Sequence, residues 1–349
     1  MTVPSFDGRR PFIAAALLVV IINGAGASPA HAQRITPFGS VLDPALSHSR
    51  TPDEIARALE LTANIAGHAS YMYEWRSGDA GLEVAGALVT LFRARGLKVF
   101  LQFAPVTLGM LRPPEGVVPS FWDPATWTRY LIDVARLASL KPDYLNLCTE
   151  VDLVFQLSPA EAVAYATLYK DAYALVKQIS PGTEVGVSYH MDFFFGLSEV
   201  WIPGVLGPYD YAAFTTYPGW LVHYGFAGRV ADIPASYYDR VRIIFPTVPV
   251  IFSEVGWPSA GPGTPIEQAE FIGSLPRLMK GVRPTMVTWV MNRDTDRFQA
   301  DQLTDDERAI FAFLGIDPAA LFQQFNSMGL VDLDGRLKPA YVAAFFNTF

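Results

Sequence analysis

The chain has 349 residues, of which 51% are hydrophobic and 13% aromatic, so it is long enough for one large domain or two ordinary ones. Its formal net charge is −8, and such an acidic chain lacks the clustered Lys and Arg that bind nucleic-acid phosphates. The one cysteine, Cys148, excludes an internal disulfide, and its apolar surroundings predict a small buried side chain rather than a catalytic thiol.

The first 32 residues have the layout of a secretory signal peptide. Arg9 and Arg10 precede an apolar run over 12–22, and Ala30-His31-Ala32 offers an A-x-A cleavage site. The run is short for a bilayer span, although an uncleaved anchor is the alternative, and the paired arginines also resemble a twin-arginine signal. We therefore expect a periplasmic or extracellular protein, whose mature part is the 317 residues 33–349.

From residue 34 onward, short β-rich apolar runs alternate with longer helical patterns, which predicts a mostly parallel sheet with helices outside it. In chain order, the predicted strands cover 38–42, 68–75, 97–105, 143–150, 184–190, 209–218, 248–257 and 285–292. Eight runs with helical connections fit a closed (β/α)₈ TIM barrel better than an open doubly wound sheet. No composition break interrupts this pattern, so we predict a single domain.

Three predicted helices begin with the same pattern. At Thr51, Ser158 and Thr264 a hydroxyl residue precedes Pro, and Glu follows three positions after the hydroxyl. This spacing predicts a capping box, so we assign these glutamates to helix starts rather than to chemistry. No GxGxxG follows a strand and no P-loop lysine appears, so no nucleotide cofactor is expected.

Two glutamates instead end predicted strands, where the active site of a parallel barrel lies. Glu150 ends the fourth run and Glu254 lies near the end of the seventh. Retaining glycoside hydrolysis needs one protonated and one ionised carboxyl group at a separation of about 5–5.5 Å. We predict that Glu150 and Glu254 are these two carboxyl groups; a buried ion pair or a solvated strand end is the alternative for each.

The stretch VPVIFSEVGWPSAG, residues 248–261, resembles the nucleophile signature of glycoside hydrolase family 17, the β-1,3-glucanases. The β-galactanases of family 53 have a similar S-E-x-G-W-P phrase. Both families belong to clan A, whose (β/α)₈ barrels have the acid/base on strand four and the nucleophile on strand seven. The resemblance implies an O-glycosyl hydrolase with these roles for Glu150 and Glu254, and a polysaccharide or oligosaccharide substrate.

Thr149 departs from that clan, in which Asn commonly precedes the acid/base. The β-mannanases of family 113 are similar here, since they have Thr-Glu at this point. A hydroxyl still hydrogen-bonds a sugar oxygen, so Thr149 is a candidate substrate contact. The β-linked substrate therefore stays open between glucan, mannan and galactan.

Further candidates follow from position. Tyr217 matches the clan tyrosine that hydrogen-bonds the nucleophile, with a turn tyrosine as the alternative, and Trp289 resembles the tryptophan under the cleaved sugar, with a core position as the alternative. His190, at the end of the fifth predicted strand, is a candidate cleft residue. Asn292 and Asp294 follow the eighth and are candidate contacts to sugar hydroxyls.

At the second predicted strand, Arg76 and Glu74 are candidate substrate contacts, although a simple ion pair at the barrel rim is the stronger interpretation. Trp257, together with Trp75 and Trp220, is a candidate sugar platform. The histidines are scattered and no HExxH or cysteine pair occurs, so no metal site is expected.

Three alternatives remain at this stage. A transglycosylase would use the same two glutamates, with a sugar in place of water. A non-catalytic sugar-binding barrel is a second alternative, because fold alone does not confer activity. An unrelated barrel enzyme, metal-dependent or of the aldolase type, would show histidine clusters or a lysine at strand ends, and neither is seen.

Overall fold

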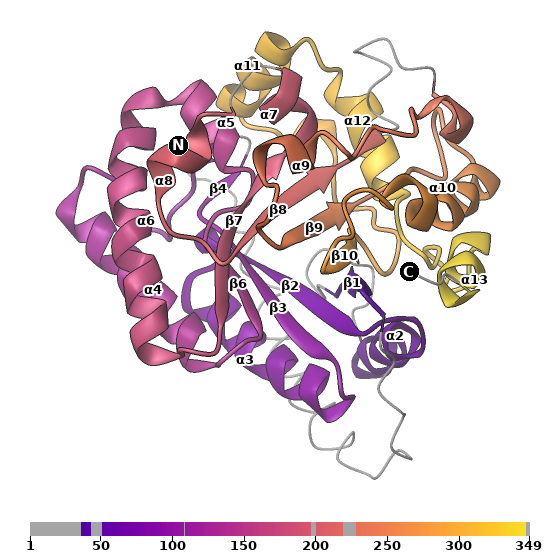
Figure 1. The fold of residues 1–349 in the computed structure, drawn as a ribbon, viewed down its shortest axis with the longest axis horizontal. Coiled ribbons are helices and arrows are strands. Elements are labelled where there is room, and N and C mark those ends of the chain that lie inside the picture. Colours follow the sequence, from indigo (N-terminus) through magenta and orange to yellow (C-terminus); the bar gives the residue numbers. More distant parts are fainter. Residues whose placement is uncertain (1–35, 43–50, 108, 197–199, 219–227, 347–349) are drawn as a thin grey trace.

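The computed structural model describes residues 36–42, 51–107, 109–196, 200–218 and 228–346. The expected signal segment and Trp220 lie outside these ranges. Eight strands close into a parallel barrel in the order β1-β10-β9-β8-β7-β6-β3-β2, with helices around it (Figure 1). The predicted single-domain (β/α)₈ barrel is therefore confirmed.

The barrel strands lie close to their predicted positions. They are β1 (Phe38–Val41), β2 (His68–Glu74), β3 (Lys98–Ala104), β6 (Tyr144–Asn146), β7 (Glu184–His190), β8 (Tyr211–Thr216), β9 (Val250–Val255) and β10 (Met286–Trp289). A small hairpin, β4 (Val106–Thr107) and β5 (Met110–Leu111), follows β3. The main difference is at β6, which ends at Asn146 instead of residue 150.

The helices lie outside the barrel or extend from its strand ends. They are α2 (Pro52–Ile65), α3 (Gly78–Ala94), α4 (Pro124–Ser139), α5 (Val151–Leu157), α6 (Pro159–Ile179), α7 (Met191–Gly196), α8 (Ile202–Leu206), α9 (Val241–Ile244), α10 (Pro265–Leu278), α11 (Asp305–Leu314), α12 (Pro318–Asn326) and α13 (Pro339–Phe346). Among the described helices, none is long and apolar enough to cross a membrane.

The predicted capping boxes are only partly correct. Thr51 forms the complete box at α2, and Thr264 accepts from the backbone of Glu267 at α10. Ser158 makes no side-chain cap at α6. Its partner Glu161 instead accepts hydrogen bonds from Ser120 and the Phe121 backbone, because the segment before α4 packs against the start of α6.

Strand alternation places successive side chains on opposite faces, so each strand fills the barrel interior with every second residue. One interior layer is apolar and consists of Phe100, Tyr211, Ala213, Ile251 and Met286. A polar layer includes the contacts of Gln102 with Ser70 and of His68 with Thr288. Burial lowers the pKa of His68 to about 3, so this histidine is a neutral core residue.

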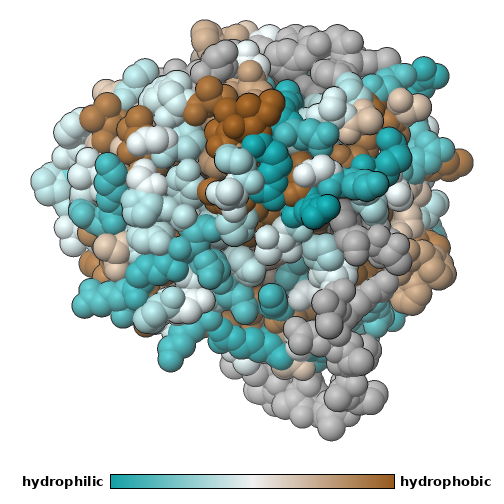
Figure 2. Space-filling model, in the orientation of Figure 1, coloured by the Kyte–Doolittle hydropathy of each residue, from teal (hydrophilic) through white to brown (hydrophobic). Residues whose placement is uncertain are grey.

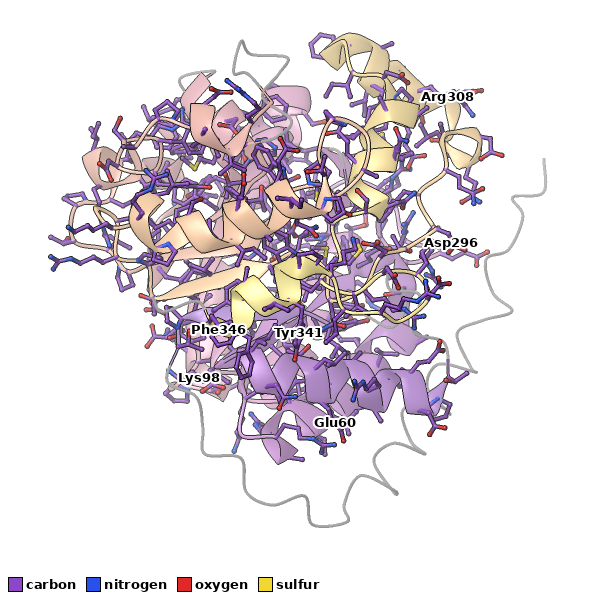
Figure 3. The ribbon with its side chains drawn as sticks, turned by 90° about the vertical axis from the view of Figure 1, so that its right-hand side faces the viewer. Glu60, Lys98, Asp296, Arg308, Tyr341 and Phe346 are labelled. Carbon is purple, nitrogen blue, oxygen red and sulfur yellow. The ribbon has the colours of Figure 1, made fainter. Side chains whose placement is uncertain are left out.

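The chain closes on itself through α13, which packs against α10 and α2. The Tyr341 hydroxyl on α13 donates to the Leu61 carbonyl on α2 over 3.0 Å. Figure 3 shows Tyr341 beside α2, the helix that also bears Glu60. This contact joins the last helix of the barrel to the first.

Candidate active site

Glu254 is aimed by an irregularity in β9. Its neighbours β8 and β10 both show a register shift beside Ser253 and Glu254: Phe252 pairs with Phe214, but Glu254 pairs with Thr215. β9 therefore has one more residue than its neighbours at this point, which is a β-bulge. Phe252 and Val255 both pack in the core between barrel and helices, so the bulge changes the alternation just where the carboxylate stands.

The carboxyl group of Glu254 is nearly enclosed, with 5% of the residue exposed. The Tyr217 hydroxyl donates to its Oε2, while Oε1 has no hydrogen-bond partner among the described residues. Burial and the nearby charge of Glu150 raise the pKa of Glu254 to about 8, and the bond from Tyr217 opposes that shift. The charge of Glu150 therefore disfavours ionisation of Glu254.

Glu150 lies on a turn instead of a strand. The backbone leaves β6 at Asn146, and Glu150 is the left-handed residue that precedes α5, with φ 54° and ψ 52°. Its backbone N–H donates to Ser188 Oγ over 3.1 Å, and the Asn146 amide donates to the same oxygen over 3.3 Å. A non-glycine residue in this region costs energy that the surrounding contacts must offset, and such residues concentrate at active sites.

Strand β8 connects the two carboxylates. Thr215 and Tyr217 lie two positions apart, so they point to the same side of the strand. The Thr215 hydroxyl donates to Glu150 Oε1 over 2.7 Å, and Tyr217 donates to Glu254. The end of β8 and the residue that directly follows it therefore supply a hydroxyl donor to each member of the pair.

Thr215, Ser188 and Asn146 were not singled out from the sequence. Their signal was weak, because all three are ordinary small polar residues of buried strands. The alternation of β8 offered one clue: once Tyr217 is placed at the site, Thr215 must face it too.

Two other predicted residues lie beside the pair. Thr149 precedes Glu150, is nearly buried, and accepts from the Asn146 amide at 3.4 Å. The His190 ring lies 6.5 Å from the Tyr217 ring and contacts Phe193, whose backbone N–H donates to its Nδ1. The structure thus brings together Glu150, Glu254, Tyr217, Thr149 and His190.

The predicted sugar platforms at Trp289 and Trp257 are not present. Trp289 follows the inward-facing Thr288, so it points outward, where it packs near Phe271 of α10 and donates to the Met328 carbonyl. Trp257 packs on the same phenylalanine, with ring centroids 5.1 Å apart. Both indoles are fully buried between barrel and helices, so these two expectations were wrong.

Trp75 is also buried. Its ring packs among Phe103, Phe121 and Tyr130, and its indole N–H donates to Asp133 at 2.9 Å. It is a core residue in the turn directly after β2, and the structure does not support a sugar-stacking role.

The expected sugar contacts after β10 are structural as well. The Asn292 amide donates to Thr62 of α2 over 2.8 Å. Asp294 accepts from the Lys338 ammonium group at 2.6 Å and from the Gly329 backbone at 2.8 Å. Burial raises the pKa of Asp294 to about 6, against the effect of Lys338. Neither side chain is available to a ligand, and both expectations are corrected.

Arg76 forms the rim ion pair that was the stronger interpretation, with its Nε 2.8 Å from Glu74 Oε2. The Glu74 charge is the main reason that the pKa of Arg76 is raised. About half of the Arg76 side chain, 49%, is exposed. It therefore remains a candidate substrate contact at the rim.

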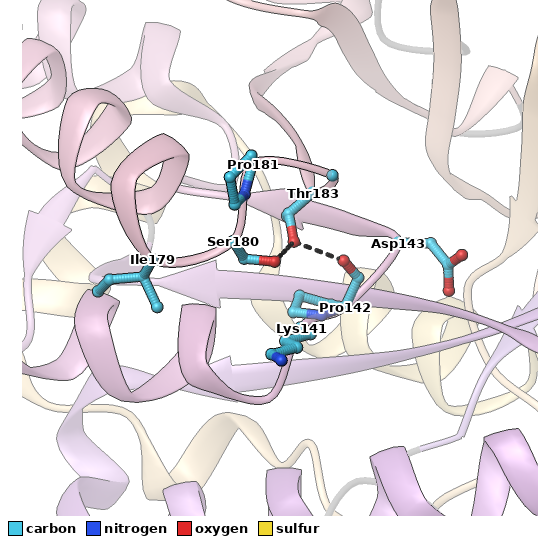
Figure 4. Close-up of a pocket in the computed structure, with 8 residues that line it drawn as sticks. Lys141, Pro142, Asp143, Ile179, Ser180, Pro181 and Thr183 are labelled. Carbon is cyan, nitrogen blue, oxygen red and sulfur yellow. Dashed lines mark hydrogen bonds between the residues drawn. The ribbon is translucent and has the colours of Figure 1, made fainter.

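A separate pocket of about 380 Å³ lies at the other end of the barrel (Figure 4). It is lined by the segments that lead into β6 and β7, where Thr183 donates to the Pro142 carbonyl and shares a hydrogen bond with Ser180. In a parallel barrel this end stabilises the fold, while chemistry takes place at the carboxyl ends of strands. We therefore do not assign this pocket to the active site.

The residue types at the site suit proton transfer and nucleophilic attack. Among the described residues, no group of three or more His, Cys, Asp or Glu side chains is arranged to hold a metal ion. Cys148 is fully buried, and burial raises the pKa of its thiol, in line with its predicted place in the core.

The sequence matches no family model and no curated protein, whereas solved structures share the fold. A GH5_18 variant from Streptomyces cattleya, solved with Manβ1-4GlcNAc, has a TM-score of 0.62 at 17% identity, over 88% of this chain and 79% of that one. The exo-β-1,4-mannosidase Op5Man5 from Opitutaceae bacterium strain TAV5 has a TM-score of 0.67 at 16% identity, over 90% and 59%. The GH53 catalytic domain of Ignisphaera aggregans has a TM-score of 0.53 at 14% identity, over 82% and 87%. The chain thus has the (β/α)₈ barrel of these clan A glycoside hydrolases.

Proposed function

We propose that this protein is a retaining glycoside hydrolase that cleaves β-linked glycans by double displacement. Glu254 is the nucleophile and Glu150 the acid/base. The proposal is supported by the nucleophile-like motif around Glu254, by the barrel shared with glycoside hydrolases, and by the pairing of the two carboxyl groups at one end of the barrel.

In the first step, the Glu254 carboxylate attacks the anomeric carbon while Glu150 gives its proton to the glycosidic oxygen. The carbon–oxygen bond breaks, the leaving sugar departs with that proton, and a glycosyl ester forms on Glu254. In the second step, Glu150 takes a proton from water, and the resulting hydroxide displaces Glu254. The pair ends with its original single proton.

The observation that carries the proposal is the pair of interacting carboxyl groups, with one hydroxyl donor from Thr215 at the end of β8 and the other from Tyr217 just after it. In the resting protein the raised pKa of Glu254 favours the proton on that residue. Attack requires the reverse arrangement, with Glu254 ionised. The hydrogen bond from Tyr217 favours that form, which gives this tyrosine a role in the first step.

The other site residues have simple roles in this proposal. Thr149 and His190, beside the pair, contact sugar hydroxyls, and Arg76 contacts substrate at the rim. The glycan is a β-glucan, β-mannan or β-galactan. Two of the structural neighbours are named for mannose-containing ligands or substrates, so mannan is the first substrate to test. We further propose that the protein is exported and meets this glycan outside the cytoplasm.

The test is a screen of β-1,4-mannan, β-1,3-glucan and β-1,4-galactan with the wild type, Glu150→Gln and Glu254→Gln. We expect one polymer to be cleaved by the wild type and by neither variant. Azide needs no general base, so with an activated aryl β-glycoside it should give the β-glycosyl azide in Glu150→Ala, by attack on the ester at Glu254, and the α-glycosyl azide in Glu254→Ala, where it takes the place of the nucleophile. Undiminished hydrolysis by Glu254→Gln would rule out the proposed nucleophile.

A further inference from the structure

Two tryptophans of the described segments have more than half of their surface exposed. Trp122 and Trp201 are 60% and 52% exposed, whereas Trp75, Trp257 and Trp289 are buried. An exposed indole loses the hydrophobic free energy that burial would provide, and apolar groups that gather on a surface often mark a binding site.

Trp201 has a defined orientation, because its ring meets Phe155 edge to face, with centroids 5.4 Å apart and an angle of 71°. Phe155 is itself 94% covered, so it forms a firm support beneath the indole. Val200 and Val205, beside Trp201 and in α8, are also exposed. Figure 2 shows hydrophobic residues at the surface over the region of α5, α7 and α8.

The support for Trp201 leads directly back to the catalytic pair. Helix α5 begins at the residue after Glu150, and Phe155 lies five residues along the chain from that glutamate. At 1.5 Å per residue this is a rise of about 8 Å along the helix. The exposed ring thus stands a short distance from Glu150, within the span of a few linked sugar units.

The position of Glu150, the proposed acid/base, shows which sugars of a bound glycan lie near Trp201. Glu150 must touch the glycosidic oxygen, and that oxygen belongs to the leaving group after cleavage. The sugars of the leaving group are therefore the ones next to the turn at Glu150 and to α5, which begins directly after it.

We propose that Trp201, supported by Phe155, is a binding platform for the leaving-group sugars of an extended neutral β-linked glycan. This inference rests on the proposed function. Flat aromatic rings pack against the apolar C–H face of a sugar, and the fixed ring needs little ordering when the sugar binds. The net charge of −8 disfavours an anionic polymer in that place.

The platform makes the protein's activity depend on the length of the glycan. A hexasaccharide of the cleaved polymer reaches the ring, and a p-nitrophenyl glycoside of its single sugar does not. We expect Trp201→Ala to lower kcat/KM for the hexasaccharide by about tenfold and to leave that for the aryl glycoside within about twofold. Trp201→Phe, which retains a flat ring, should recover most of the loss.

The matched control is Phe346→Ala, at the carboxyl end of α13 (Figure 3), because Phe346 is also exposed, at 72%, on a helix that packs on α2 and α10. It should change neither substrate's kcat/KM. An equal loss for both substrates in Trp201→Ala, or no loss for either, would overturn the platform. So would a change of sedimentation coefficient in that variant without a change in kinetics, which would identify the patch as an interface between copies of this chain.

Calorimetry separates this inference from the proposed hydrolysis. The binding of the mannan, glucan and galactan hexasaccharides to Glu254→Gln is measured with and without Trp201→Ala. Weaker binding in the double variant supports the platform even where the wild type hydrolyses nothing, in which case the hydrolase proposal alone fails. Equal binding by both proteins, or binding by neither, refutes the platform.

Discussion

At the scale of single residues, Glu254 is a buried acid with one hydrogen-bond donor, and Glu150 is a partly buried acid with a donor of its own. Both donors come from one short segment, since Thr215 lies on β8 and Tyr217 is the residue after that strand. A carboxyl group that is harder to ionise in the folded state than in the unfolded state makes the folding stability depend on pH.

The first prediction concerns this sensitivity. The pKa of Glu254 in the folded protein, about 8, is above its usual value of 4.5, so between these values the folded chain holds a proton that the unfolded chain has released. Stability therefore falls as pH rises from about 4.5 to about 8 and stays reduced above pH 8.

The variant Glu254→Gln removes this cost and retains an acceptor for Tyr217. We expect its melting temperature to exceed that of the wild type by about 3–6 °C at pH 8 and to equal it at pH 4, measured by calorimetry. A difference that is the same at both pH values contradicts the assignment.

The second prediction concerns Thr215. Valine has the same shape but no hydroxyl, so Thr215→Val leaves Glu150 without its 2.7 Å donor and free to turn away from the sugar. We expect kcat to fall by about tenfold, the effect of roughly one lost hydrogen bond to a charged group, with little change in KM, and Thr215→Ser to restore it. The control is Thr216→Val, since Thr216 is the next residue on the opposite face of β8. Equal losses in Thr215→Val and Thr216→Val would point to general disruption of the strand.

At the scale of elements, the site depends on two departures from regular structure. The bulge in β9 reorients Glu254, and the left-handed turn after β6 presents Glu150. The hydrogen bonds of Ser188 hold that turn, because its hydroxyl accepts from both the Glu150 backbone and the Asn146 amide.

The third prediction tests that support. Ser188→Ala leaves the backbone N–H of Glu150 without its partner in a covered environment. We expect a loss of about 1–3 kcal/mol in unfolding free energy, measured by urea titration, together with a fall in kcat as Glu150 loses its orientation. Ser274→Ala is the control, because that hydroxyl bonds only to its own helix, α10, at Phe271. Retention of full kcat by a destabilised Ser188→Ala would show that the turn does not orient the acid.

These departures also explain the limits of prediction from sequence. The positions of Glu150, Glu254 and Tyr217 followed from strand ends and a motif, and the structure places them together. The prediction of Trp289 as a sugar platform was wrong because neighbouring strand residues point to opposite faces: Thr288 points into the barrel, so Trp289 points outward. The bulge could not be predicted, since no residue pattern distinguishes one extra strand residue from a regular strand.

At the scale of the whole molecule, the eight-strand order was predictable because a closed parallel barrel satisfies every run of the alternating pattern at once. The capping residues were predictable in part. The capping box predicted at Ser158 is absent because its partner Glu161 instead accepts hydrogen bonds from the segment before α4. Long-range partners such as Lys338 with Asp294 are set by the fold and have no local signal.

The fourth prediction concerns that pair, which joins the segment before α13 to the segment after β10. The Lys338 ammonium group also donates to the Ser259 hydroxyl at 2.7 Å, and Ser259 follows Glu254 by five residues. Lys338→Met leaves Asp294 buried without its cation, so we expect a loss of about 3 kcal/mol in unfolding free energy, measured by denaturant titration. The double variant with Asp294→Asn should regain much of it. If the double variant loses as much as the single one, the cost lies elsewhere than in the unpaired acid.

The extra residue in β9 has a consequence for how such enzymes are recognised and redesigned. The direction of the Glu254 side chain depends on one extra residue, so the same sequence in a regular strand would point this carboxylate into the helix layer. A redesigned barrel that keeps the amino-acid composition but lacks the extra residue in β9 would still pack well. Its Glu254 carboxylate would no longer point to the open end of the barrel.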